Sequence, residues 1–156
     1  MQAAILSVGA DATDSLYKEQ AMAGKFFSTN TVTLTTGQTI PLSISRVCGC
    51  SMKLDNDAIE LFSQGTYLVN VSITAAQTGT TAMGARIMID SPSGITPSEG
   101  AVVTSSDTTA GNSRSLSLTD TVRVCKSCFC GRPKIYIMAT GEMTVSNIIV
   151  TVTKVG

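Results

Sequence analysis

The stretch that most constrains the fold is Ile59–Ala76, IELFSQGTYLVNVSITAA. After Gly65, apolar and polar side chains alternate with a period of two. The apolar residues of this stretch are Tyr67, Val69, Val71, Ile73 and Ala75. Because successive side chains of a β-strand point to opposite faces, the pattern predicts a strand with one face toward a core. Leu68 is apolar on the other face, where its neighbours Asn70 and Ser72 are polar.

Shorter patterns of the same kind recur from Thr31 to the end of the chain, each followed by turn-forming residues. Further strands are predicted over residues 31–34, 40–44, 46–54, 84–90, 101–104, 113–124, 134–139 and 146–155. Asp120 interrupts the apolar face of the segment 113–124. Short strands separated by turns, with no convincing helix among them, indicate an antiparallel sandwich or barrel.

Residues 1–30 differ from this pattern. Asp14 or Ser15 can cap a short helix that ends at Gly24, and the alternative is an extended arm that becomes ordered on a partner. We therefore expect an N-terminal arm over residues 1–30 and one β domain over residues 31–156.

Aromatic residues of the predicted arm are its candidate anchors. Tyr17, Phe26 and Phe27 can insert into a groove of a partner, since aromatic side chains dominate such contacts. The alternative is that these rings pack against the arm's own domain.

The charge balance narrows the classes of partner. Lys plus Arg and Asp plus Glu both number 11, so the formal net charge is zero, which argues against binding nucleic acid through its phosphates. Only 14% of residues are charged, which is low for the free surface of a monomer. We therefore expect partner subunits to cover part of the surface.

No sequence signal points to a membrane or to secretion. No apolar run approaches the roughly 20 residues that span a bilayer. The segment MQAAILSVGADATD has no basic region before its apolar stretch, unlike a signal peptide. Synthesis in a cytosol, without a membrane partner, is the expectation.

Two segments carry a family resemblance that covers roughly residues 31–156. FSQGTYLVNVSITA resembles the Gly-x-Tyr-x-Val strand of the TNF/C1q-like jelly roll, and SNIIVTVTKV resembles its closing strand. The Thr-rich variety is most similar to head-fibre or capsid decoration proteins of tailed phages and to C-terminal domains of bacterial collagen-like surface proteins. The sequence has no Gly-X-Y collagen run, which favours the phage type. The resemblance implies an all-β, antiparallel jelly-roll sandwich, here with an N-terminal arm.

The resemblance also implies an assembly and a role. Family members are homotrimers in which apolar inner-sheet faces pack about a threefold axis, and here Leu68, Asn70 and Ser72 are the candidate contact residues. The expected function is that of a structural virion protein, assembled in the host cytoplasm, anchored to the outer capsid surface by its arm. The alternative is a jelly-roll module of a bacterial surface protein that binds a cell-surface glycan.

Five cysteines are the most chemically suggestive residues: Cys48, Cys50, Cys125, Cys128 and Cys130. If the jelly roll holds, the strand of Cys48 and Cys50 neighbours the strand after Cys130, so all five sulfurs can gather at one end. Because the chain has no His, a structural zinc ion would need thiolate ligands. A disulfide with one spare cysteine is an alternative.

Inert burial is the third alternative for the cysteines. Cys48 and Cys50 share a predicted strand face with Met52 and Leu54, and thiols pack well in apolar cores. No cofactor is therefore expected apart from a structural zinc ion in the first alternative.

Two weaker clusters involve charged residues. Asp55, Asp57 and Glu60 offer oxygen ligands for Ca²⁺, but no EF-hand spacing supports such a site, and a solvated turn is the favoured interpretation. A basic cluster near the cysteines is interpreted as a solvated sheet end, and the alternative is contact with an acidic surface or glycan. Its members are Arg123, Lys126, Arg132 and Lys134.

The sequence argues against catalysis. With no His, the common Ser-His and Cys-His nucleophile systems are excluded. The chain also lacks the GxSxG, GxxxxGK[ST] and GxGxxG motifs, and no carboxylate spacing picks out an acid–base pair. We therefore do not expect an enzyme.

Overall fold

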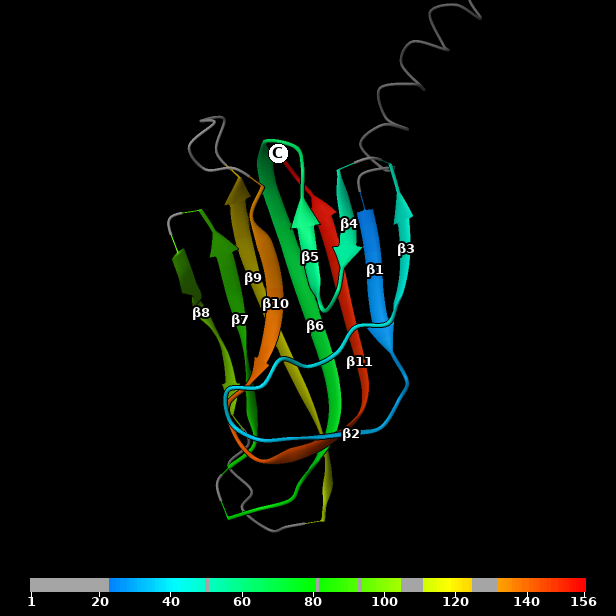
Figure 1. Cartoon of the computed structure of the whole chain (residues 1–156), viewed down its shortest axis with the longest axis vertical. Coiled ribbons are helices and arrows are strands. Elements are labelled where there is room, and N and C mark those ends of the chain that lie inside the picture. The colour runs from blue at the N-terminus through cyan, green and yellow to red at the C-terminus, as the bar shows by residue number, and fades with distance from the viewer. Residues whose placement is uncertain (1–22, 50, 81, 93, 105–110, 125–131) are drawn as a thin grey trace, which may run out of the picture.

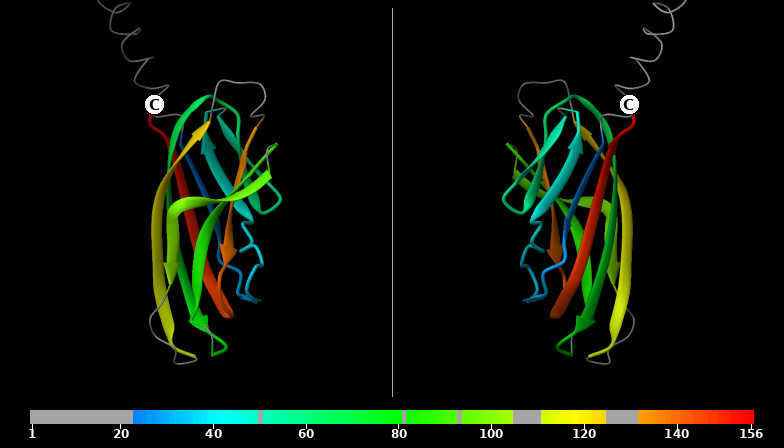
Figure 2. Two further views of the ribbon diagram at one scale, coloured as in Figure 1. Left: turned by 90° about the vertical axis from the view of Figure 1, so that its left-hand side faces the viewer. Right: turned by 90° about the vertical axis from the view of Figure 1, so that its right-hand side faces the viewer.

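The computed structural model describes residues 23–49, 51–80, 82–92, 94–104, 111–124 and 132–156. Over these ranges the chain forms eleven strands in two antiparallel sheets that pack face to face (Figures 1 and 2). The predicted all-β antiparallel sandwich is confirmed. Within the same ranges no helix is long and apolar enough to cross a membrane.

Five strands form the main path of the first sheet, here called sheet A. Their order is β3 (Ile44–Cys48), β1 (Ala23–Ser28), β11 (Met143–Lys154), β6 (Gly65–Gln77) and β9 (Ser113–Val124). A short strand, β2 (Val32–Leu34), pairs with the beginning of β11. The long strand predicted after Gly65 is therefore an interior strand, with β11 on one side and the edge strand β9 on the other.

The second sheet, sheet B, also has five strands. Their order is β4 (Met52–Asp55), β5 (Ala58–Leu61), β10 (Lys134–Ala139), β7 (Gly84–Ser91) and β8 (Gly94–Thr104). The inward faces of the two sheets enclose one hydrophobic core. Tyr67, Val69 and Ile73 on β6 are fully buried there, as their alternation predicted. The Tyr67 hydroxyl donates a 2.6 Å hydrogen bond to the Ser63 carbonyl, so its polar end is satisfied.

The N-terminal boundary of the domain differs from the prediction. Residues Ala23–Ser28 form β1, which pairs with β3 on one side and β11 on the other. The arm predicted over residues 1–30 is therefore wrong for this part, and Gly24 lies within a strand instead of ending a helix. Phe26 points into the core and is fully buried, whereas Phe27 points outward and is half-buried.

The predicted single strand over residues 46–54 is two strands in different sheets. β3 ends at Cys48 in sheet A and β4 begins at Met52 in sheet B. Gly49 lies between them with φ of +91°, a conformation that glycine adopts without steric cost. Cys48 and Met52 consequently do not share a face, since Cys48 is exposed and Met52 is buried.

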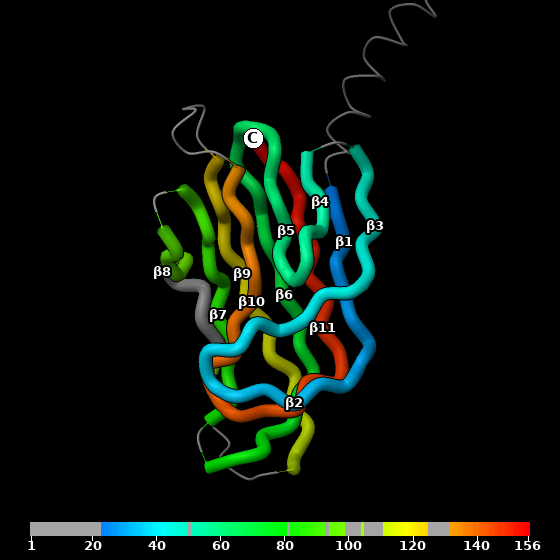
Figure 3. The backbone as a smooth tube through the Cα atoms, in the orientation of Figure 1, coloured from blue at the N-terminus to red at the C-terminus, as the bar shows by residue number. Residues whose placement is uncertain are grey.

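A crossing segment, residues 35–43, connects β2 to β3 and runs across the face of the sandwich that carries β10 (Figure 3). It leaves β2 in sheet A and bonds to β10 in sheet B, where Ile40 N donates to Ile137 O and Ala139 N donates to Gln38 O, both at 2.8 Å. Ile40 and Leu42 on this segment are buried in the core. The crossing segment therefore continues sheet B along the part of β10 that β5 does not reach.

Asp120 links the edge strands β8 and β9 of the two sheets. It occupies a core-facing position of β9 between Leu118 and Val122, and its carboxylate accepts a hydrogen bond from the buried Ser98 hydroxyl of β8. β8 and β9 are edge strands of different sheets, so this bond ties the two edges together. The interruption that Asp120 makes in the apolar pattern is thus explained by a polar partner across the layers.

Gly65 provides a test of how tightly the end of the chain is packed. A Cβ at this position would overlap the backbone oxygen of Gly156, which accepts a 3.1 Å hydrogen bond from Thr66 N. Gly94 also has a positive φ, +126° against +148° for Gly65, but open space around it. Backbone strain should cost about 1–2 kcal/mol in both Gly65→Ala and Gly94→Ala. We expect Gly65→Ala to lose about 1–3 kcal/mol more in urea unfolding, and equal losses would contradict the contact.

Candidate assembly surface

The outward face of sheet A carries three rows of side chains, each crossing all five strands of the main path. The first row is Ile44, Phe27, Ile149, Ser72 and Ser117. The second row is Arg46, Lys25, Thr151, Asn70 and Thr119. The third row is Cys48, Ala23, Thr153, Leu68 and Thr121. Together these three rows form the candidate assembly surface, called the assembly surface from here on.

The chemistry of the assembly surface is unusual for a face open to water. None of its side chains is acidic, and the two cations, Lys25 and Arg46, lie together on the β1 and β3 side. Ile44 is 40% exposed, and Phe27 and Ile149 continue an apolar strip from it toward the middle of the sheet. Lys25 Nζ lies 5.3 Å from the Phe27 ring centroid, a cation–π distance. The remaining rows are mostly hydroxyl and amide groups.

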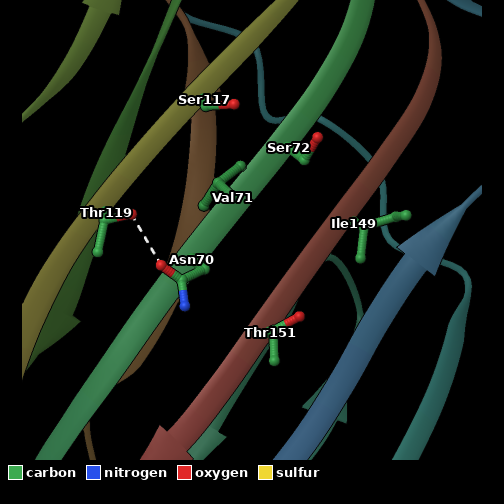
Figure 4. Close-up of a pocket in the computed structure, with 7 residues that line it drawn as sticks. All are labelled: Asn70, Val71, Ser72, Ser117, Thr119, Ile149 and Thr151. Atoms are coloured by element: carbon green, nitrogen blue, oxygen red, sulfur yellow. Dashed lines mark hydrogen bonds between the residues drawn. The ribbon is translucent and has the colours of Figure 1, made fainter.

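A shallow groove of about 260 Å³ lies in the middle of this surface (Figure 4). Its walls come from β6, β9 and β11, and Thr119 Oγ1 donates a 2.7 Å hydrogen bond to Asn70 Oδ1 across it. The predicted contact residues Leu68, Asn70 and Ser72 all lie on this surface. Asn70 and Ser72 line the groove, and Leu68 occupies the next row.

The outward face of sheet B has the opposite character. A row of alternating charge crosses four of its strands, formed by Lys53, Glu60, Lys134 and Asp90. Lys53 Nζ lies 3.5 Å from Glu60 Oε2, and Lys134 Nζ lies 2.8 Å from Asp55 Oδ2. The hydrogen bond and charge of Lys134 lower the pKa of Asp55, and the same contact raises the pKa of Lys134. Charges of both signs in register are typical of a solvated sheet face.

Of the five cysteines, Cys48 alone lies within the described residues. Cys48 is exposed at the end of β3, so inert burial is wrong for this residue, while Cys50, Cys125, Cys128 and Cys130 lie outside the described residues. The expected neighbourhood of strands is also wrong, because β3 pairs with β1 in sheet A and β10 belongs to sheet B. Among the residues with described positions, no three acidic or thiol side chains are placed to hold a metal ion.

The two charged clusters predicted from the sequence are not assembled. Asp55 and Glu60 are paired with lysines, and Asp57 Oδ1 accepts a 3.4 Å hydrogen bond from Leu42 N, so the three do not converge on a Ca²⁺ site. Arg123 lies on sheet A and Lys134 on sheet B.

Arg132, the third described member of the basic cluster, forms a cation–π contact. Its guanidinium lies 4.7 Å from the Phe62 ring centroid. Lys126 lies outside the described residues, as does Tyr17 of the predicted anchors. Phe26 is a core residue and cannot be an anchor, and Phe27 belongs to the assembly surface.

Sequence reasoning missed the apolar strip of Ile44, Phe27 and Ile149. A signal for it exists in two adjacent apolar pairs, Phe26-Phe27 and Ile148-Ile149. Because neighbouring side chains of a strand face opposite ways, one member of each pair has to point outward. Phe27 and Ile149 are those members, and the register places them directly opposite each other.

Comparison with known proteins finds similar folds but no similar sequence. No family model and no curated protein sequence matches the chain. The structure of Eiger TNF from S. frugiperda matches with a TM-score of 0.67 at 11% identity, over 86% of this chain and 92% of that chain. Murine APRIL at pH 8.5 matches with a TM-score of 0.58 at 11% identity, over 84% and 98%. The fold is a TNF-like jelly roll. The PRD1 vertex protein P5 matches with a TM-score of 0.49 at 16% identity, over 87% and 98%, and the fold assignment rests on the first two.

The ion pair of Asp55 and Lys134 predicts a defined pH dependence. The folded pKa of Asp55 lies below 3.8, so its contribution to stability is complete above 3.8 and is lost as pH falls through the folded value. The raised pKa of Lys134 sets the alkaline limit, where the contribution is lost as pH rises through a value above 10.5. Asp55→Asn should therefore lower the Tm slightly at pH 7 and leave it unchanged at pH 2.

Salt and a neighbouring variant complete this test. Both groups are exposed, so 1 M NaCl should also shrink the difference in Tm. Asp90→Asn removes a carboxylate from the same face without removing the 2.8 Å contact and should have less effect. A Tm difference for Asp55→Asn that persists at pH 2 would show that the residue acts through packing.

Proposed function

We propose that this protein is a structural protein of a tailed-phage particle, a homotrimeric capsid decoration or head-fibre protein. Its N-terminal segment holds the capsid, and its jelly roll is displayed on the outer surface of a particle assembled in the host cytoplasm. The observation that carries the proposal is the acid-free assembly surface of sheet A, with its exposed apolar strip. The TNF-like fold and the sequence resemblance to phage decoration proteins support it.

Desolvation favours sheet A over sheet B as the subunit contact. Burying a charge costs several kcal/mol unless it is paired with good geometry. Sheet B carries a row of four charges, whereas the β6, β9 and β11 part of the assembly surface carries none. Hydroxyl and amide groups there can exchange water for hydrogen bonds to a second copy at little net cost. Lys25 and Arg46 lie to one side, where a rim position can keep them hydrated.

The low charge of the whole chain agrees with a covered face. Only 14% of the residues are charged, and a surface that contacts other subunits needs fewer charged groups than one that faces water. Self-association through one sheet face leaves the charged outward face of sheet B in water. The threefold arrangement is the part of the proposal that comes from the family resemblance.

Residues 1–22 are the proposed capsid anchor. The anchor is shorter than the segment 1–30 expected from the sequence, since β1 begins at Ala23 inside sheet A. Of the three aromatic anchors, Tyr17 remains, because Phe26 is buried and Phe27 lies on the assembly surface. The proposal includes no catalytic activity, no cofactor, no nucleic acid and no membrane. A zinc ion or disulfide at the cysteines remains a prediction.

The mass in solution tests the trimer. Light scattering at micromolar concentration should give three times the subunit mass of 16.2 kDa. Leu68→Asp places a charge on the assembly surface and should raise the trimer dissociation constant by about 10–100-fold, with a smaller effect on the Tm of the subunit. A monomeric wild type would overturn the proposal.

A matched substitution on the other sheet provides the control. Ile95 is 58% exposed at the end of the sheet B row, next to Asp90. Ile95→Asp also replaces an apolar side chain by a charged one, but away from the assembly surface, and should leave the trimer intact. If Ile95→Asp dissociates the trimer and Leu68→Asp does not, sheet B is the contact face.

Truncation tests the anchor separately. Deletion of residues 1–22 should leave a folded trimer with an unchanged sheet A, because β1 is retained. The truncated protein should fail to associate with capsids to which the full chain binds, as measured by co-sedimentation. Normal decoration by the truncated trimer would place the anchor within the jelly roll.

A further inference from the structure

A second surface feature lies on sheet B, where β10 changes its pairing partner. Lys134 and Ile135 pair with β5, whereas Ile137 and Ala139 bond to the crossing segment. Tyr136 lies between these two pairing regions of β10. The turn between β4 and β5 lies near it and contains Asn56, which has a φ of +55°. The sheet therefore has a local gap with β10 as its floor.

This gap forms a hollow of about 240 Å³ with mixed polar walls. The residues that matter for recognition are Thr39, Asn56, Asp57, Asp90, Lys134 and Tyr136. The volume is below the roughly 300–1,000 Å³ of pockets for drug-sized ligands, so the hollow suits a single ring. Tyr136 is half-buried and contributes an aromatic surface in a protein whose aromatic content is 4%.

The hydrogen-bonding capacity of the hollow is only partly used within the protein. The Lys134 ammonium is bonded to Asp55, and Asp57 accepts one long hydrogen bond from Leu42 N. The Asp90 carboxylate forms no hydrogen bond with another described residue. Thr39, Asn56 and Tyr136 add hydroxyl and amide groups that both donate and accept. Acceptors and donors thus surround one aromatic ring.

We propose that this hollow binds one uncharged sugar ring. Neighbouring ring hydroxyls would donate to Asp57 and Asp90 and accept from Lys134 or Asn56, while the apolar face of the ring rests on Tyr136. The full lining also includes Asp55, so Asp55, Asp57 and Asp90 stand against Lys134 and make it net acidic, which disfavours anionic sugars. The presence of hydroxyl, amide and ammonium groups beside the carboxylates favours a polyol over a simple cation.

The proposed sugar site is independent of the proposed trimer. It lies on the outward face of sheet B, and the assembly surface lies on the outward face of sheet A, with the core between them. Three copies joined through sheet A would leave three hollows open to solvent. Because linked sites gain avidity, weak single sites on such a particle can still hold a glycan-coated surface.

Saturation-transfer NMR on the full-length protein tests the proposal. The probes are methyl glycosides of glucose, galactose, mannose and N-acetylglucosamine. At least one should bind saturably, with a dissociation constant on the order of 1 mM because the ligand is small and the hollow is open. Asp90→Asn and Tyr136→Ala should each weaken that binding by about tenfold or more.

Three comparisons make the result decisive. Glu60→Gln removes a carboxylate from the same face outside the hollow and should change binding by less than about twofold. The Tm of each variant should match that of the wild type, so that lost binding is not lost folding. The methyl glycoside of sialic acid and methylammonium should not compete.

Three results would overturn the sugar site. They are binding by none of the four glycosides, binding that survives both substitutions in the hollow, and preference for methylammonium or sialic acid over every neutral probe. None of these results bears on the mass in solution, which tests the trimer by itself.

Discussion

The register of β6 between β11 and β9 is the constraint on which the rest of the structure depends. A shift of one residue would move Tyr67, Val69 and Ile73 from the core to the outside, because side chains alternate along a strand. The same register therefore sets both faces of sheet A at once. It buries the apolar side chains of β6 and places Leu68, Asn70 and Ser72 in rows that continue onto four other strands. The assembly surface is a consequence of the pairing that builds the core.

The two outward faces of the sandwich differ in chemistry and suit different environments. Sheet B pairs its charges across neighbouring strands, and such pairs are well solvated in water but cost free energy to bury. The three rows on β6, β9 and β11 of sheet A carry hydroxyl, amide and apolar groups, which lose little when a protein surface replaces water. The contrast between the faces, more than the character of either one, distinguishes a face suited to subunit contact from a face suited to solvent.

Elements with a regular local pattern could be predicted from the sequence, and those that depend on distant partners could not. β6, β10 and β11 show clear alternation, and their inward faces are as predicted. β1 was not predicted because Gly24 and the pair Phe26-Phe27 disturb the alternation. Pairing with β3 and β11 on its two sides nevertheless makes it a strand.

Sheet membership was equally out of reach of local patterns. The segment around Cys48 and Met52 alternates correctly, yet a turn at Gly49 sends its halves into different sheets. Alternation of side chains predicts which face of a strand is buried, but not which strand lies beside it. The rows of the assembly surface bring together residues as distant as Phe27 and Ile149, so their existence follows from the register alone.

The hollow on sheet B depends on the same long-range pairing, but on different strands. Its floor is β10, and its walls come from the crossing segment and the β4–β5 turn, none of which belongs to the main path of sheet A. Packed sheets lie about 10 Å apart, with a layer of buried side chains between them. A substitution at a hollow-lining position such as Thr39 or Asn56 can therefore reshape the hollow without disturbing the rows on sheet A. The proposed ligand recognition and the proposed self-association can thus vary separately, since each depends on its own outward face and the two faces share only the core.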